Sequence, residues 1–312
     1  MREPPLFEPG CRRDRRRCAR SCDLGRSPGT TPAPRRGRGL SLALILVSHD
    51  SGPLLEACLR RAAGAASVSA IRLIDNHSND GVPERVAALF ADDSRFSMQK
   101  RADNPGFGTA CNQGAASCDS DWLLFLNPDC DVDPETVDQL LARAQAAVNP
   151  GVIGLASRTP SGQLERATTR LLPSCSRLLF GPRQAQLDVA KPWQEVEAGS
   201  GALMLISRRL FEQLGGFDRD FFLHAEDLDL MARARKFGAQ NYVALDLRAT
   251  HHQGSSSQQR PWFVAWHKHV NLARFLWRHP QHVGDRLLWP ALALGLMVHG
   301  VWEAARIAIR RQ

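Results

Sequence analysis

Two aspartates stand one residue apart just after a short apolar run in the middle of the chain. The run covers residues 122–126, Asn127 and Pro128 follow it, and the acids are Asp129 and Asp131. A continuous apolar run of this length predicts a strand that is buried on both faces. Because residues i and i+2 of an extended chain point to the same side, both carboxylates can face one point beyond the strand. Such a pair suits a Mg²⁺ or Mn²⁺ ion that holds a diphosphate, and a plain polar turn is the alternative.

A second group of acids opens a predicted helix over residues 225–237. Glu226, Asp227 and Asp229 lie in its first turn and its last turn is basic, which is the arrangement that the helix dipole favours. The dipole does not explain the apolar residues 221–223 that precede the acids. They predict a partly desolvated pocket, in which the pKa of a carboxyl group rises and the group can accept a proton from a hydroxyl.

Single polar residues after other predicted strands extend this chemistry. Asp75 ends one strand, where its carboxylate can accept hydrogen bonds from a base or a ribose hydroxyl. An Asx turn is the alternative there and also in the loop at residues 104–108. His251 follows the last predicted strand, where a neutral imidazole can complete the coordination of a Mn²⁺-like ion or have a structural role.

Strands and helices are predicted to alternate through the first half of the chain. The strands are expected at residues 41–47, 70–74, 96–99 and 122–129, and the helices at 54–63, 83–90, 109–117 and 134–148. This alternation indicates a mainly parallel α/β sheet. Because each strand ends in Asp, Asn, Ser or Gly, polar groups gather at one edge, as a nucleotide site requires. The second half is less regular, with strands expected at 151–157, 201–207 and 241–245, helices at 209–215 and 263–278, and a loop-rich insertion at 158–196.

The positive charge of the chain is concentrated in its first 40 residues, which hold 11 Arg, no Lys and 4 acidic residues. The rest holds 29 basic and 28 acidic residues, so the globular part is nearly neutral and we expect no nucleic-acid surface on it. We expect residues 1–39 to be a basic, disordered head; binding to anionic lipid or nucleic acid and a misplaced start codon are the alternatives. The eight cysteines form no Cys-x-x-Cys pair, and the chain opens with no apolar segment. A reducing, cytoplasmic setting without a secretory signal is therefore expected.

The C-terminal segment is apolar over residues 287–302 apart from Pro290, glycine and His299, and basic residues flank it. The segment is shorter than the ~20 residues that span a bilayer. We expect residues 283–312 to form a membrane-associating helix that lies in the interface. Packing on the main domain is the alternative.

Together these segments resemble the family 2 glycosyltransferases with the GT-A fold, and most closely their bacterial rhamnosyltransferase-like members, over about residues 41–280. The order and spacing of seven segments carry the resemblance: 47–52, 74–81, 104–108, 126–129, 215–218, 221–230 and 251–256. The resemblance implies a Rossmann-like, mainly parallel α/β domain at residues 40–282 with a C-terminal helical extension. The first strand departs from the family, because His49 and Asp50 stand where these enzymes often have Tyr-Asn.

The resemblance implies a role for several of these residues. Asp129 and Asp131 resemble the metal-binding pair, and His251 resembles the histidine that meets the metal or the diphosphate. Asp227 resembles the catalytic base, with Glu226 as the second candidate. The implied donor-nucleotide contacts are Ser48, Asp50, Asp75, Asn76, Asn104, Gly106, Asn112 and Asp129.

The implied activity is that of an inverting, metal-dependent hexosyltransferase with Mg²⁺ or Mn²⁺. Its expected donor is a dTDP- or UDP-linked sugar, with rhamnose suggested, and its expected acceptor is a lipid-linked glycan of the cell envelope. The resemblance places such a protein on the inner face of the cytoplasmic membrane. A sugar-nucleotide pyrophosphorylase would need a cationic phosphate loop after the first strand, which residues 48–52 lack. The other alternative is a non-catalytic nucleotide-sugar-binding or membrane-associated protein on a degenerate GT-A fold.

Overall fold

The computed structural model describes residues 40–181, 187–188, 190–252 and 261–309. The basic head expected at residues 1–39 and the Gly-Ser-Ser segment at 254–256 lie outside the described residues.

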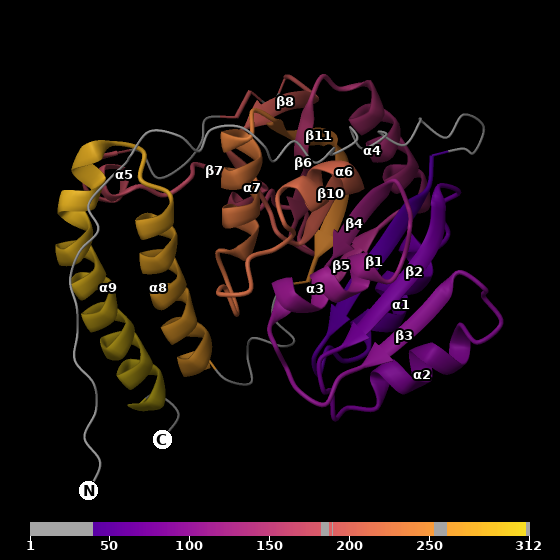
Figure 1. Ribbon diagram of the computed structural model, residues 1–312. Helices are drawn as coiled ribbons and strands as arrows, with labels where there is room; N and C mark the ends of the chain where they lie inside the picture. The colour runs from indigo at the N-terminus through magenta and orange to yellow at the C-terminus, as the bar shows by residue number, and fades with distance from the viewer. Residues whose placement is uncertain (1–39, 182–186, 189, 253–260, 310–312) are drawn as a thin grey trace, which may run out of the picture. The chain divides into compact units, whose positions relative to one another are not determined.

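Strands and helices alternate through the first half of the described chain (Figure 1). Its elements are β1 (Leu42–Ser48), α1 (Leu54–Ala62), β2 (Val68–Asp75), α2 (Val82–Leu89), β3 (Phe96–Lys100), α3 (Phe107–Ala116), β4 (Trp122–Leu126), β5 (Cys130–Val132) and α4 (Pro134–Ala146). The second half contains β6 (Pro150–Arg158), the 3₁₀ turn η1 (Arg166–Thr168), β7 (Thr169–Arg170), α5 (Cys175–Phe180), β8 (Trp193–Val196), β9 (Ala198–Gly199), β10 (Leu203–Ser207), α6 (Arg208–Gln213), α7 (Glu226–Lys236), β11 (Gln240–His251), α8 (Pro261–Arg278) and α9 (Val283–Ile309).

A central sheet runs through the main domain in the order β3-β2-β1-β4-β10-β6-β11-β5, with β8 paired to β11. The strands β1 to β4 are parallel to one another, and β6 is parallel to β11. The strand β10 lies antiparallel between β4 and β6. The predicted mainly parallel α/β architecture is therefore confirmed, with antiparallel strands inserted in its second half.

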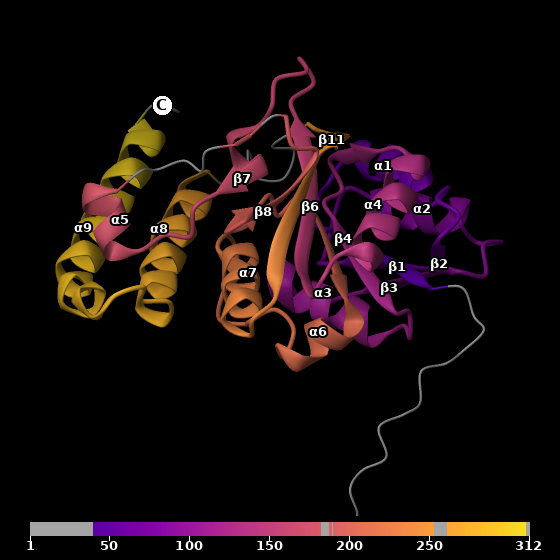
Figure 2. The same ribbon diagram turned by 90° about the horizontal axis from the view of Figure 1, so that it is seen from above.

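Helices cover both faces of this sheet (Figure 2). Leu42, Leu44 and Leu46 of β1 pack in one hydrophobic cluster with α1, α2 and α4. Ala43 and Ile45 belong to a second cluster, on the other face, with α3, α6 and α7. Every residue of β1 is buried, as the apolar run of the sequence predicts for a strand in the middle of a three-layer domain.

The strand that was expected to reach Asp129 ends earlier, at Leu126. Asn127 to Asp129 form a turn in which Cys130 N donates a hydrogen bond to Asn127 O at 3.1 Å. Pro128 has no N–H group to donate to a strand ladder, which explains the break. The chain then forms β5, which pairs antiparallel with β11. The strand β11 extends well beyond the predicted residues 241–245. Its pairing with β5, β6 and β8 supports its alternating, less apolar residues.

The C-terminal helix extends on both sides of the apolar stretch at residues 287–302. It runs unbroken for 27 residues, from Val283 to Ile309, with Pro290 inside it. Packing against α8, including a 2.8 Å hydrogen bond from Trp289 Nε1 to Ala273 O, supports it there. By length and composition, Val283–Arg306 is able to cross a membrane, so the expectation of a segment too short to span was wrong. Figures 1 and 2 show α8 and α9 side by side, next to the sheet domain.

Candidate active site

His251 lies between two carboxylates at the end of β11. Its Nε2 is 3.3 Å from Asp129 Oδ1, and its Nδ1 is 3.2 Å from Glu165 Oε1. The pairing of β5 with β11 creates this arrangement, since it sets His251 opposite Cys130, the residue after Asp129. Burial opposes the charged imidazole, but the hydrogen bonds and charges of Asp129 and Glu165 outweigh it and raise the pKa of His251 above its ordinary value.

Asp129 and Asp131 line one cavity of about 120 Å³. The carboxylate of Asp131 is engaged there by Arg61, whose Nη1 lies 2.6 Å from Asp131 Oδ2. Arg61 also forms an ion pair with Asp133. A cation at this point would compete with a guanidinium for Asp131, so Asp129 is the stronger ligand candidate of the two.

The polar groups expected to contact the donor lie at the ends of β1 and β2. Ser48 is in register with Asp75, so the last residues of the two strands are neighbours. Asp75 is fully buried, and its Oδ1 accepts a hydrogen bond at 2.9 Å from Ser78 N, which is three residues on rather than the two of an Asx turn. Its Oδ2 has no partner among the described residues, which leaves an acceptor for an N–H or O–H group of a ligand.

The loop before α3 extends this edge. Asn104 Oδ1 accepts hydrogen bonds from Asn76 Nδ2 at 3.2 Å and from Gly106 N at 3.0 Å. Asn76 Oδ1 is buried and has no partner among the described residues. Gly106 has a φ of +89°, and a Cβ atom there would lie 2.2 Å from Phe222 O. Only glycine therefore fits this contact between the Asn104 loop and the segment before α7.

Ser48, Asp50 and Asn112 are engaged in holding the loops. Ser48 Oγ bonds to Ser51 Oγ at 3.2 Å, and Asp50 Oδ1 accepts a hydrogen bond from Asn79 N at 2.7 Å. Both polar ends of the Asn112 amide bond to the backbone of Phe217, at 2.8 Å each. The Asn112 side chain thus positions the chain before α7, and its expected contact with the donor nucleotide stays a prediction.

Glu226 and Asp227 begin α7 in different environments. Glu226 is buried, its Oε2 has no partner among the described residues, and burial together with the charge of Asp227 raises its pKa to about 8. Asp227 Oδ2 forms an ion pair with Arg170, while its Oδ1 accepts a hydrogen bond from Leu228 N at 2.8 Å. At neutral pH the carboxyl group of Glu226 is therefore largely protonated, while that of Asp227 is paired with the guanidinium of Arg170.

The backbone before these acids is strained. His224 and Ala225 have φ values of +66° and +67°, a region that costs side-chain-bearing residues about 1–3 kcal/mol each. Asn271 of α8 donates a hydrogen bond to Leu223 O at 2.8 Å, and Gly106 packs closely on the backbone of Phe222. These contacts hold the turn that directs Glu226 and Asp227.

Three residues of the site region were absent from the sequence interpretation: Arg61, Glu165 and Arg170. Glu165 and Arg170 belong to the insertion at 158–196, whose sequence has weak periodicity and gave no signal. Glu165 is buried between His251 and Ser157, and Arg170 bonds to both Gly199 O and Asp227. Both residues reach the site only through contacts with residues far away in the sequence, His251 for Glu165 and Asp227 for Arg170.

Comparisons with known proteins agree with this arrangement. The family model described as "Glycosyl transferase family 2" matches residues 43–215. N-acetylglucosaminyl-diphospho-decaprenol L-rhamnosyltransferase of Mycobacterium tuberculosis is 28% identical over 247 residues, which cover 70% of this chain and 78% of that protein.

Two solved structures share the fold at 15% identity and a TM-score of 0.58. The mannosyltransferase PcManGT from Pyrobaculum calidifontis, in complex with GDP-Man and Mn²⁺, matches over 85% of this chain and 75% of its own. GalNAc-T7, with UDP, GalNAc and Mn²⁺, matches over 70% of this chain and 44% of its own. These likenesses confirm the predicted GT-A fold.

Proposed function

Because the chain belongs to glycosyl transferase family 2, we propose that it transfers a sugar, with inversion, from a nucleotide-diphosphate donor to a hydroxyl of a lipid-linked glycan. One observation carries the proposal. A Cβ atom at Gly201 would lie 2.6 Å from Asp227 Oδ2, and the next carbonyl, Ala202 O, accepts a hydrogen bond from Asn127 N at 2.8 Å. The two-residue segment Gly201–Ala202 therefore contacts both Asp227 of α7 and the Asn127–Asp129 turn.

Asp227 is the proposed proton acceptor. Its Oδ2 atom is held by an ion pair with Arg170. As the acceptor oxygen bonds to the anomeric carbon, its proton passes to Asp227, and the bond from that carbon to the diphosphate breaks with its electron pair on the leaving oxygen. Glu226 is neutral at pH 7 because its pKa is about 8, so it can donate a hydrogen bond in the same pocket.

Asp129 and His251 fit a divalent cation. A carboxylate oxygen and an imidazole nitrogen 3.3 Å apart suit two ligand positions on Mg²⁺ or Mn²⁺. Such an ion supplies positive charge to a leaving diphosphate. Both solved relatives carry Mn²⁺, which supports a metal without selecting between the two.

Asp75 and Asn76 are the proposed donor-recognition residues. Each presents a buried oxygen without a partner among the described residues, and such oxygens match the N–H groups of a base or the hydroxyls of a ribose. The mycobacterial relative is named for rhamnosyl transfer to a decaprenol-linked sugar. We therefore propose a dTDP- or UDP-linked sugar, with rhamnose as the first candidate, and a lipid-linked acceptor of cell-envelope glycan synthesis.

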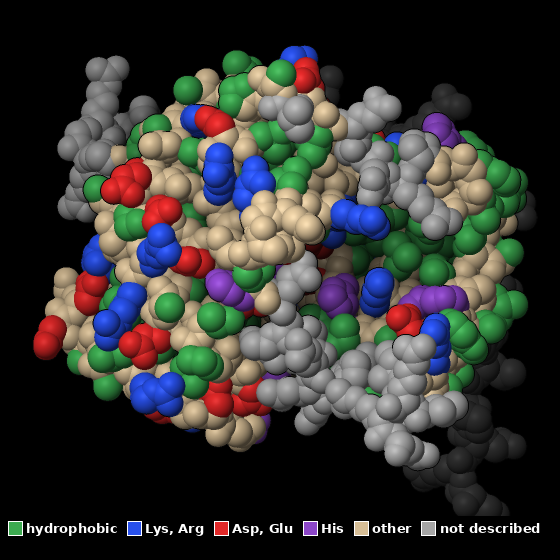
Figure 3. All heavy atoms as spheres, turned by 180° about the vertical axis from the view of Figure 1, so that it is seen from behind, with side chains coloured by type: hydrophobic (Ala, Val, Ile, Leu, Met, Phe, Trp, Pro, Cys, Tyr) green, Lys and Arg blue, Asp and Glu red, His purple; other side chains and the backbone are tan. Residues whose placement is uncertain are grey.

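The helix α9 is the proposed membrane contact. Hydrophobic side chains gather over this helix pair (Figure 3). The large exposed ones on α9 are Val283, Leu287, Leu294, Met297, Val298, Val301 and Trp302. Arg306 lies over the Trp302 ring at 5.3 Å, a pair suited to the membrane interface. Attachment to the inner face of the cytoplasmic membrane would bring the site to a lipid-linked acceptor.

Calorimetric titration with UDP, dTDP and GDP, with and without Mn²⁺, tests the proposed site. We expect one nucleotide to bind in a metal-dependent manner, and Asp129→Asn to lose that binding. If the folded protein bound none of them, the non-catalytic alternative would replace the proposal. Flotation with anionic liposomes tests the membrane contact separately, and Val298→Glu combined with Val301→Glu should abolish it without changing nucleotide binding.

A further inference from the structure

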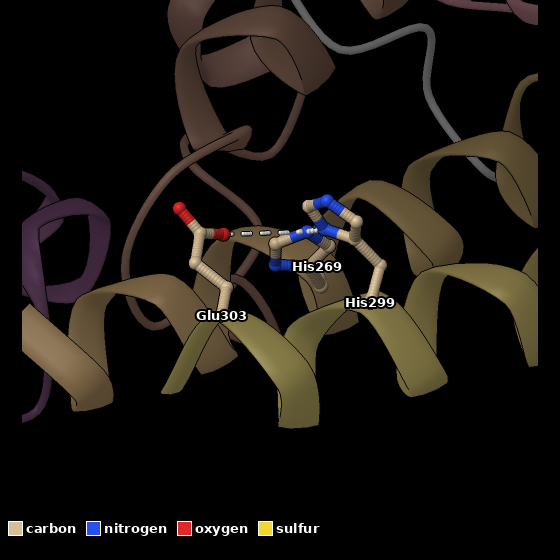
Figure 4. Close-up of side chains that lie close together, drawn as sticks. All are labelled: His269, His299 and Glu303. Atoms are coloured by element: carbon tan, nitrogen blue, oxygen red, sulfur yellow. Dashed lines mark hydrogen bonds and ion pairs between the residues drawn. The ribbon is translucent and has the colours of Figure 1, made fainter. Parts of the chain in front are cut away.

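A cluster of three potential metal ligands lies between α8 and α9 (Figure 4). His269 belongs to α8, while His299 and Glu303 belong to α9, one helical turn apart. One ligand atom from each side chain lies within 4.8 Å of the others. The proposed transfer mechanism uses none of these groups.

Hydrogen bonding selects the tautomer of His269. Its Nδ1 lies 2.7 Å from the carbonyl oxygen of Ala265, and a carbonyl can only accept, so the ring proton is on Nδ1. The Nε2 atom of the neutral ring then carries a lone pair that faces α9. An N–H group bonded to a backbone carbonyl is the usual second contact of a metal-binding histidine.

The spacing of the three groups suits tetrahedral coordination. Ligand atoms bound at about 2.0–2.1 Å to a tetrahedral ion stand about 3.3 Å apart. His269 Nε2 is 2.8 Å from His299 Nδ1 and 3.7 Å from Glu303 Oε2, values on either side of that separation. Small rotations of the exposed His299 and the half-buried Glu303 would equalise them.

The helices approach closely at this point because α9 has a glycine there. A Cβ atom at Gly300 would lie 3.2 Å from the Cβ of His269, which is closer than most such contacts. Trp302 packs beside the His299 ring, with centroids 5.6 Å apart. The histidine of α8 is therefore held against the backbone of α9, while one side of the cluster stays open to water.

We propose that His269, His299 and Glu303 bind a divalent transition-metal ion of the Zn²⁺ type, which cross-links α8 to α9. Two imidazoles and one carboxylate form a ligand set that Zn²⁺ takes, with water in the fourth position. The ion fixes the rotation of α9 on α8, and with it the direction of the exposed apolar side chains of α9. This site is separate from the Asp129–His251 pair, for which Mg²⁺ or Mn²⁺ is proposed.

Zn²⁺ titration of the full-length protein without a histidine tag tests the site, with Mg²⁺ in excess to occupy the oxygen ligands at Asp129. We expect one equivalent of Zn²⁺ to bind. His299→Gln should weaken this binding at least tenfold, because glutamine keeps a hydrogen bond to His269 but is a poor zinc ligand. His282→Gln, which changes an exposed histidine outside the cluster, should leave it unchanged.

Two control proteins separate loss of the site from misfolding and from Zn²⁺ bound elsewhere. Circular dichroism of the metal-free His299→Gln protein checks that it folds, and His251→Gln reports any Zn²⁺ held at the Asp129 site. In cobalt-loaded protein, visible absorption typical of tetrahedral coordination should be present in the wild type and absent in His299→Gln. Equal Zn²⁺ affinity of the wild type and His299→Gln, or no Zn²⁺ binding by the folded wild type, would overturn the proposal.

Discussion

The guanidinium of Arg170 forms an ion pair with the carboxylate of Asp227, although the two residues are 57 positions apart. Arg170 is fixed in turn by hydrogen bonds to Gly199 O, one of them 3.0 Å long. The insertion at 158–196 therefore supplies the counter-charge of the proposed base.

Removal of that counter-charge should slow transfer. In Arg170→Ala the Asp227 carboxylate loses the guanidinium that holds it in place, so kcat/KM should fall by roughly tenfold to a hundredfold, as for a misplaced catalytic group. Arg170→Lys keeps a cation at this position and should restore part of the rate. A wild-type kcat/KM in an Arg170→Ala protein that folds normally by circular dichroism would show that the ion pair does not contribute to transfer.

Replacement of Glu226 should change how stability depends on pH. Its folded pKa of about 8 lies above the ordinary value of 4.5. The stability of the folded, protonated form is thus fully present below pH 4.5 and is lost as the pH rises towards 8. The side chain of Glu226→Gln cannot ionise. On the scale of 1.36 kcal/mol per pKa unit, the free energy of unfolding of this variant should exceed that of the wild type by about 1 kcal/mol or more at pH 9. The difference should be smaller at pH 5. Urea unfolding at the two pH values measures the difference, and parallel pH profiles would contradict the buried, protonated state.

Gly106 should be far less tolerant of alanine than Gly81. Both have positive φ, +89° and +68°, but a Cβ atom at Gly81 meets nothing within 4 Å, whereas one at Gly106 would collide with Phe222 O. We expect Gly81→Ala to cost about 1 kcal/mol of stability and Gly106→Ala about 3 kcal/mol, together with weaker nucleotide binding. Urea unfolding and calorimetry test this, and equal losses of stability would argue against the contact.

The two aspartates of the proposed metal site should respond differently to amide substitution. Because Arg61 already engages Asp131, Asp131→Asn should lower Mn²⁺-dependent nucleotide affinity only a few-fold. Asp129→Asn should lower it at least tenfold, which corresponds to about 1.4 kcal/mol. The exposed Arg61 ion pair also predicts a stability change below about 1 kcal/mol for Asp131→Asn. Equal loss of affinity in the two variants would indicate that Arg61 moves away when the metal binds.

The sequence predicted the parts of the fold and site that depend on local pattern. Apolar runs marked the parallel strands, and the polar residues after them located Asp75, Asp129 and the Glu226–Asp227 pair. Glu165 and Arg170 could not be found in this way, since their partners His251 and Asp227 are 86 and 57 positions away. The length available to span a membrane was underestimated because only the apolar stretch at residues 287–302 was counted, whereas the helix continues on both sides of it and packs against α8.

The measurement that tests the account most directly is a comparison of Asp227→Asn with the wild type, in both donor binding and sugar transfer. Asparagine keeps the size of the side chain but cannot take the proton of an acceptor hydroxyl. The account predicts that transfer falls by at least 10²-fold, within the range that general-base catalysis contributes, while Mn²⁺-dependent donor binding stays within about twofold. Loss of donor binding by a folded Asp227→Asn protein, or transfer at the wild-type rate, would contradict the assignment of Asp227 as the base.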